Sequence, residues 1–110
     1  MHISNMNKYV EIAKRIDVDF DNEGRFAWDI IGLTKYDYIQ NLSGEKIELF
    51  EGQYVYLCMK TDDNPLDYVV AEGTVIRNTF NSKPCKWYCK IVGKIEYIDD
   101  YNQKFGNVSD

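Results

Sequence analysis

The sequence predicts a single all-β domain, a small barrel of six or seven mostly antiparallel strands. Apolar and polar residues alternate with a period of two over much of the 110-residue chain, as they do in strands with one buried face. Turn sequences rich in glycine, asparagine and aspartate separate these stretches at short spacing. Gly73 and Gly93 interrupt the two longest stretches, where bends or bulges would help a sheet to close.

The first stretch is predicted as a strand that begins near Val10. Even positions from Val10 to Phe20 are apolar except Lys14, and odd positions are mostly charged. A short helix over residues 6–16 is the alternative, because several apolar residues there also keep helical spacing. The turn at Asp21–Gly24 is followed by Phe26, Trp28 and Ile30 with the same period of two, so residues 10–31 are expected to form a hairpin.

The middle of the chain predicts four more strands, over 34–40, 46–49, 53–60 and 68–78. In the stretch 53–60, Val55, Leu57 and Met59 alternate with Tyr54, Tyr56 and Cys58, so both faces are largely apolar. Such a pattern indicates a central strand, or one whose outer face meets a partner.

The stretch Cys85–Ile98 gives the clearest strand. One face holds Trp87, Cys89, Ile91, Ile95 and Tyr97, and the other holds Lys86, Tyr88, Lys90, Lys94 and Glu96. The first set is expected to be buried and the second to form the outer surface. Residues 1–98 are therefore assigned to one barrel domain and 99–110 to a polar C-terminal tail. The expected core includes Trp87, Ile91, Ile95, Val55, Leu57 and Val75.

Composition and charge narrow the functional classes. The net charge is −5 and the pI about 4.8, so duplex DNA, which requires a basic surface, is not an expected partner. No apolar run approaches the length of a membrane span, and the N-terminus lacks the apolar segment of a signal peptide. We therefore expect a cytoplasmic protein without a membrane partner. Three cysteines, an odd number, favour reduced thiols.

The sequence does not predict an enzyme. The only histidine is His2, so no nucleophilic triad is available in the expected barrel. There is no phosphate-binding glycine loop, and no CxxC pair or other metal-binding pattern. Most of the eighteen acids fall in turns or on exposed strand positions, where solvation explains them. No cofactor and no metal are expected.

Two surface features remain as candidate binding sites. The acidic one comprises Asp17, Asp19, Asp21 and Glu23, and the basic one comprises Lys86, Tyr88, Lys90 and Lys94. No acid occurs between Gly73 and Ile95, and lysines that alternate with an aromatic ring can hold a nucleotide or a single strand. In a simpler interpretation the first and last strands are neighbours, and the two sets of charges pair across them.

The preferred hypothesis is a small acidic inhibitor or immunity-type protein that binds another, basic protein, for example a nucleic-acid enzyme. The acidic cluster would steer association with a basic cleft. Aromatic contact area would come from Tyr36, Tyr38, Tyr54 and Tyr56. The alternative hypothesis is a barrel that binds a nucleotide or single-stranded nucleic acid through the basic face.

Residues 41–98, about half of the chain, resemble a PilZ-type barrel. The resemblance rests on NLS at Asn41–Ser43, on EGQYVYL and VVAEGTVIR, and on the closing aromatic strand. PilZ domains bind cyclic di-GMP through an RxxxR stretch and a [DN]xSxxG turn. Asn41 and Ser43 match that turn, whereas Lys46 replaces its last glycine and no RxxxR is present. The resemblance implies a barrel, with a cyclic dinucleotide as the alternative ligand, and OB-fold barrels share the same pattern.

Overall fold

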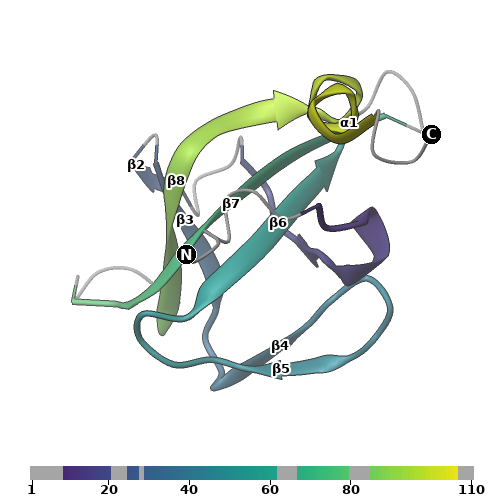
Figure 1. Cartoon of the computed structure of the whole chain (residues 1–110). Helices are drawn as coiled ribbons and strands as arrows, with labels where there is room; N and C mark the ends of the chain where they lie inside the picture. The colour runs from purple at the N-terminus through teal and green to yellow at the C-terminus, as the bar shows by residue number, and fades with distance from the viewer. Residues whose placement is uncertain (1–8, 21–24, 28, 62–66, 80–84, 107–110) are drawn as a thin grey trace, which may run out of the picture.

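The computed structural model describes residues 9–20, 25–27, 29–61, 67–79 and 85–106. Within these residues, six strands form one curled sheet in the order β1-β6-β7-β8-β3-β2 (Figure 1). They are β1 (Ile16–Asp17), β6 (Tyr54–Lys60), β7 (Tyr68–Arg77), β8 (Trp87–Tyr97), β3 (Ile30–Thr34) and β2 (Arg25–Ala27). All neighbours are antiparallel except β1 and β6, and β1 and β2 are the sheet edges. The predicted small, mostly antiparallel all-β fold is confirmed, with the sheet curled as a half-barrel.

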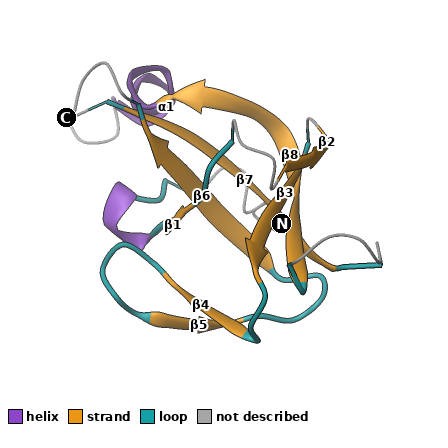
Figure 2. Ribbon diagram, turned by 180° about the vertical axis from the view of Figure 1, so that it is seen from behind, coloured by secondary structure: helices purple, strands orange, loops and turns teal. Residues whose placement is uncertain are grey.

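A second sheet and two helical segments complete the fold. Strands β4 (Tyr38–Gln40) and β5 (Lys46–Glu48) pair with each other, and a 3-10 turn, η2 (Ile12–Lys14), precedes β1. The C-terminal helix α1 spans Ile98–Gly106. The small sheet lies at one end of the curled sheet and α1 at the other, as two opposite views show (Figures 1 and 2). No described helix has the length and apolar composition needed to cross a membrane.

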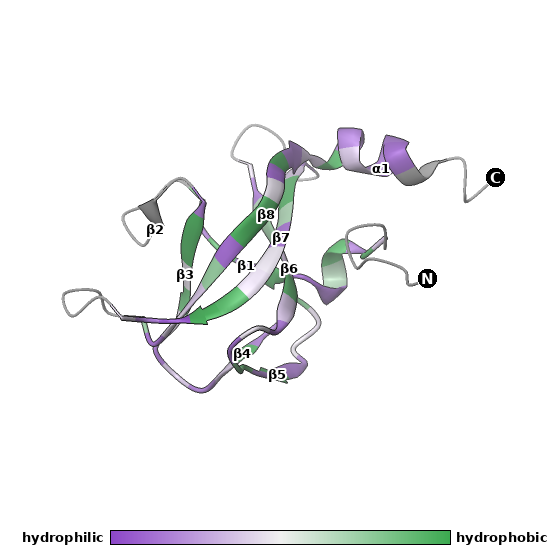
Figure 3. Cartoon of the chain, turned by 60° about the vertical axis from the view of Figure 1, so that its left-hand side comes forward, coloured by the Kyte–Doolittle hydropathy of each residue, from purple (hydrophilic) through white to green (hydrophobic). Residues whose placement is uncertain are grey.

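The core lies between the concave side of the curled sheet and the inner side of the small sheet. Of the six predicted core residues, five are buried, and Ile95 is partly buried and packs against them. Ile39, Ile47 and Leu49 contribute from the small sheet. Apolar stretches follow β3 and β8, whereas α1 is largely polar (Figure 3). The period-of-two pattern therefore identified the inward face of the central strands correctly.

The two glycines that interrupt the long strands have different roles. Gly73 faces Ile91 in the β7–β8 register, and a Cβ at this position would lie 2.8 Å from the Lys90 carbonyl carbon and 2.9 Å from Cys89 Sγ. The two strands approach too closely there for any side chain. Gly93 instead has φ +81°, a conformation that L-residues rarely adopt, and it lies within a register shift between the same strands.

The prediction of a long first strand and of a hairpin over residues 10–31 is wrong. Strand β1 is only two residues long and pairs in parallel with β6, Ile16 lying opposite Leu57, whereas β2 pairs with β3. The reason lies in Arg15, a residue on the supposedly exposed face, which is completely buried. Its side chain turns inward to backbone carbonyls, so the alternating pattern breaks there. The helical alternative is closer, because η2 falls within residues 6–16.

Part of the predicted polar tail is ordered as a helix. Asp99 and Asp100 occupy the first turn of α1, where carboxylates interact favourably with the helix dipole. Tyr101 is buried and forms a small second core with Cys58 and Val70 on the convex side of the sheet. Ile98 and Tyr101, three residues apart, are the sequence signal for this helix.

Candidate functional site

An exposed aromatic surface lies on the outer side of the small sheet. In the β4–β5 register Tyr38 faces Glu48, and the Leu49 N–H donates to the Asp37 carbonyl oxygen at 3.0 Å. Alternation then directs Ile39, Ile47 and Leu49 into the core and the residues between them outward. We call Tyr36, Tyr38 and Phe50, whose exposed fractions are 57%, 43% and 60%, the aromatic face.

Charged groups surround the rings of the aromatic face. The rings of Tyr36 and Tyr38 are stacked, with centroids 6.1 Å apart. The Lys46 Nζ lies 4.9 Å from the Tyr38 ring centroid, and the Lys35 Nζ lies 5.9 Å from that of Tyr36. Because the side chains of Tyr36 and Tyr38 remain exposed beside these ammonium groups, this surface can take part in stacking, cation–π and apolar contacts.

The chain segment that carries Tyr36 is held in place by Lys86, the residue directly before β8, and by Thr34. The Lys86 N–H donates to the Thr34 carbonyl oxygen at 2.9 Å, and the Tyr36 N–H donates to Thr34 Oγ1 at 3.1 Å. The Lys86 ammonium also forms an ion pair with Asp37. A hydrogen bond from Lys86 lowers the pKa of the Asp37 carboxyl. These contacts fix the backbone from which the aromatic face extends.

The predicted set of four tyrosines is divided between the two sheets. Tyr54 and Tyr56 lie half-buried on β6, with ring centroids 5.5 Å apart in an edge arrangement. The Tyr54 hydroxyl donates to the Glu72 carboxylate at 2.8 Å, and the Arg15 guanidinium lies 5.7 Å from the Tyr56 ring centroid. Burial, together with Glu72, raises the pKa of both hydroxyls. Tyr54 and Tyr56 thus make contacts within the molecule, whereas Tyr36 and Tyr38 are exposed.

The acidic cluster is only partly described by the structure. Asp17 and Asp19 are exposed, whereas Asp21 and Glu23 lie outside the described residues. Partial burial, and then the charge of Asp19, raise the pKa of Asp17. Asp17 lies beside Cys58 at the β1 edge of the main sheet, so this pair of carboxylates is on a different sheet from the aromatic face.

The predicted basic face is contradicted by the structure at one residue, Tyr88, which is buried. Lys86, Lys90 and Lys94 are exposed, but Tyr88 has an exposed fraction of only 1%, so the expectation that it lies on an outer surface is wrong. Tyr88 lies opposite Gly32 of β3 in the β3–β8 register, where the glycine has no side chain to compete for the space beside it.

The ion pairs also differ from the simplest interpretation of the two charged surfaces. Strand β8 lies between β7 and β3, not beside β1, so the predicted pairing of first-strand acids with last-strand lysines is wrong. Lys90 instead pairs with Asp29 at 3.0 Å, and Lys86 with Asp37. In the part of the chain that the structure describes, Lys94 forms no ion pair.

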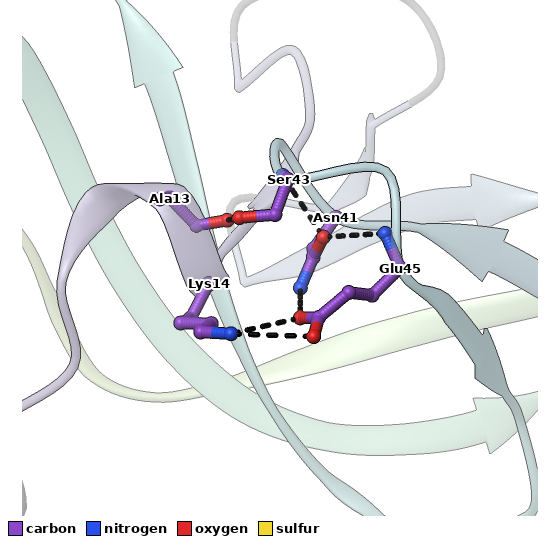
Figure 4. A network of polar contacts seen from close by, with 5 residues as sticks. All are labelled: Ala13, Lys14, Asn41, Ser43 and Glu45. Atoms are coloured by element: carbon purple, nitrogen blue, oxygen red, sulfur yellow. Dashed lines mark hydrogen bonds and ion pairs between the residues drawn. The ribbon is translucent and has the colours of Figure 1, made fainter.

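The turn that resembles the PilZ motif is used for internal hydrogen bonds (Figure 4). Asn41 Oδ1 accepts hydrogen bonds from the Ser43 and Glu45 N–H groups, both at 3.0 Å, and Asn41 Nδ2 donates to Glu45 Oε1 at 2.8 Å. Ser43 Oγ donates to the Ala13 carbonyl oxygen at 2.9 Å, and Lys14 forms an ion pair with Glu45 at 3.1 Å. The hydrogen bond from Asn41, followed by the one from Lys14, lowers the pKa of Glu45. This network ties the turn to η2.

The cysteines are free thiols, and in the part of the chain described here no cluster of side chains is placed to bind a metal ion. All three thiols are free, and burial raises the pKa of Cys58 and of Cys89 to about 12, so neither is a thiolate at neutral pH. Cys58 and Cys89 belong to separate clusters on opposite sides of the sheet. The described residues contain no group of three or more side chains placed to hold a metal ion.

Phe50 and Arg15 are the important residues that the sequence analysis did not select. In the alternating pattern, Phe50 falls on the same side as Lys46 and Glu48, and Ile47 and Leu49 fall on the other side. Because the alternating positions 46 and 48 are charged and face solvent, an aromatic residue at the next position of that set indicates an exposed ring. The sequence gives no comparable sign that Arg15 is buried, because an arginine among charged, odd-numbered positions is ordinarily exposed to solvent.

Comparisons of the chain with models of protein families, with curated proteins and with solved structures find no match.

Proposed function

We propose that the protein is a non-catalytic inhibitor that binds another protein through the aromatic face. The observation that carries this proposal is the exposure of Tyr36, Tyr38 and Phe50 on one side of a sheet whose other side is fixed in the core. Large aromatic side chains supply much of the binding energy at protein interfaces, because they bury a large apolar area and lose little conformational entropy.

The charge of the molecule supports a basic partner. The chain carries eighteen acids and thirteen lysines or arginines, and Asp17 and Asp19 are exposed together at one sheet edge. Acids outside a contact surface increase the rate of association with a basic protein, and this effect weakens with salt. A nuclease or another nucleic-acid enzyme, whose cleft is basic, fits this description, and occupation of the cleft would inhibit it.

The test is a capture experiment with matched variants. The purified chain, the triple variant Tyr36→Ser/Tyr38→Ser/Phe50→Ser and the control variant Tyr97→Ser are used as bait in extracts of the native host or its competitors. Tyr97 is a suitable control because it is an exposed tyrosine on β8. We expect a stoichiometric basic protein with the wild type and the control, and its loss with the triple variant.

Two results contradict the proposal. In the first, the triple variant retains the partner while circular dichroism shows an unchanged fold. In the second, no extract yields a stoichiometric protein at low or high salt. A variant with Asp17→Asn and Asp19→Asn should still capture the partner at low salt, but should associate more slowly, because it removes steering charges rather than contacts.

A second candidate function is binding of a cyclic dinucleotide or a single strand of nucleic acid. The stacked rings of Tyr36 and Tyr38, with Lys35 and Lys46 beside them, support it, since bases stack on exposed rings and phosphates pair with lysines. The exposed Lys94 on β8 belongs to the basic face considered for the same role. If neither cyclic di-GMP nor short oligonucleotides raise the melting temperature at millimolar concentration, this candidate is rejected.

A further inference from the structure

The Tyr38 ring of the aromatic face and the neighbouring Glu48 carboxylate are placed to hold a cation between them. Tyr38 and Glu48 are directly opposite each other in the β4–β5 register and share the outer side of the sheet. The Lys46 ammonium lies near both, 4.9 Å from the Tyr38 ring centroid and 3.9 Å from Glu48 Oε2. The chain's own lysine therefore already occupies a position between an aromatic surface and a negative charge.

Lys46 interacts only weakly with the Glu48 carboxylate. A separation of 3.9 Å is too long for a hydrogen bond, so the Lys46–Glu48 contact is a loose ion pair. The side chains of Lys46 and Glu48 are 59% and 81% exposed, and exposed pairs of this kind contribute little to stability. Displacement of Lys46 by a better cation would thus disturb the fold very little.

We propose that Tyr38 and Glu48 form a recognition site for an arginine side chain of the partner protein, and that Lys46 is displaced when it binds. This inference rests on the proposed function and specifies the chemistry of the partner. A guanidinium group is planar, so it can lie over the Tyr38 ring while its N–H groups make paired hydrogen bonds to the Glu48 carboxylate. An ammonium group cannot make both interactions with the same geometry.

The carboxylates and lysines near Tyr38 determine which cations compete for the site. The other nearby carboxylate, Asp37, is already paired with Lys86, which leaves Glu48 as the acceptor beside Tyr38. The competing cations are Lys46, over Tyr38, and Lys35, over the adjacent Tyr36 ring. The molecule as a whole carries a charge of −5, which attracts a basic segment toward the surface.

The test is an NMR titration of the folded chain with short peptides at low salt. The probes are hexa-arginine, hexa-lysine and hexa-glutamate, and the chain is labelled with ¹⁵N. We expect hexa-arginine to perturb the amides of residues 36–38 and 46–50, to bind more tightly than hexa-lysine, and to bind far more tightly than hexa-glutamate.

Matched variants distinguish this site from general attraction to a negative molecule. Glu48→Gln and Tyr38→Leu should each weaken binding of hexa-arginine, whereas Glu11→Gln, an exposed acid elsewhere, should have little effect. Lys46→Gln should tighten binding by about two- to fivefold because it removes the internal competitor. Lys60→Gln, which changes the net charge equally at an exposed position on β6, should not reproduce that gain.

The inference is overturned if hexa-arginine perturbs Asp17 and Asp19 rather than the aromatic face, or if Lys46→Gln binds no better than Lys60→Gln. It is also overturned if a captured protein partner depends on Tyr36, Tyr38 and Phe50 but not on Glu48. The proposed docking surface would survive in that case. If the peptide results follow the prediction but no protein partner is found, the proposed function fails and the arginine site stands.

Discussion

The Arg15 side chain contacts four separate segments of the described chain. Its Nε donates to the Val10 carbonyl oxygen at 3.0 Å, and its Nη1 donates to the carbonyl oxygens of Leu57 and Ala71 at 3.1 Å. Its guanidinium also lies 4.7 Å from the centroid of the Tyr101 ring. One planar cation thus joins the N-terminal segment, β6, β7 and helix α1. No pattern of hydrophobicity could predict this, because the contacts are long-range and mainly to backbone.

Arg15→Lys is expected to lower the free energy of unfolding by at least about 2 kcal/mol, because a lysine cannot donate to three separated carbonyls or stack as a plane. Urea denaturation measures the change. The matched control is Arg77→Lys, an exposed arginine whose guanidinium lies 4.6 Å from the Trp87 ring centroid, where less than about 1 kcal/mol should be lost. Equal stability of Arg15→Lys and wild type would show that the guanidinium contacts are not needed.

Asn41→Ala is expected to cost about 1–3 kcal/mol, because it leaves two backbone N–H groups of the turn without their acceptor. The same substitution at Asn102, an exposed position of α1, should change stability by less than about 0.5 kcal/mol. Thermal and urea unfolding of both variants give the comparison. A harmless Asn41→Ala would mean that the turn does not depend on its side-chain hydrogen bonds.

The same network predicts a specific dependence on pH. Because the pKa of Glu45 is lowered in the folded state, its ionised form stabilises the fold. This contribution is complete above the unfolded pKa, about 4.3 for glutamate, and is lost as the pH falls through the lower folded value. The difference in unfolding free energy between wild type and Glu45→Gln should therefore be present at pH 6 and shrink toward pH 3. A constant difference over this range would contradict the assignment.

At the scale of elements, the sequence pattern predicts strands well where both neighbours are long strands. In β6, β7 and β8 the alternation placed Val55, Val75 and Trp87 in the core, because register errors there would expose a whole apolar face. At the ends of the chain the pattern was insufficient. The partner of β1 is set by tertiary contacts, and α1 depends on a small cluster around Tyr101 rather than on a long apolar stripe.

Gly73→Ala tests the close contact of β7 and β8. A methyl group at this position would collide with the Lys90 backbone, which cannot move without separating the two strands. We expect a loss of about 1–3 kcal/mol or more. Gly44→Ala is the control, since Gly44 has φ +84° but open space around its Cα, so only the conformational cost of about 1–2 kcal/mol applies. Urea unfolding measures both variants. A smaller loss of stability for Gly73→Ala than for Gly44→Ala would contradict this description of the sheet.

At the scale of the whole molecule, the sequence indicated single exposed residues but not how the selected residues are grouped. Tyr36 and Tyr38 were selected and are exposed, but the acids selected with them that the structure describes lie at another sheet edge. Phe50 was omitted, and Tyr88 was expected outside and is buried. Alternation within one strand shows which side of the sheet a residue faces. Which of these residues come together on one surface depends on how the two sheets pack.

The central claim is that the aromatic face binds a protein, and the affinity of the captured partner for single variants tests it most directly. Surface plasmon resonance would compare the wild type with Tyr38→Ser and with Tyr97→Ser, which removes another exposed tyrosine, on β8. We expect Tyr38→Ser to raise the Kd about 30-fold or more, mainly through faster dissociation, and Tyr97→Ser to have little effect on the Kd. Equal affinities for the three proteins, with all three folded, would contradict the claim.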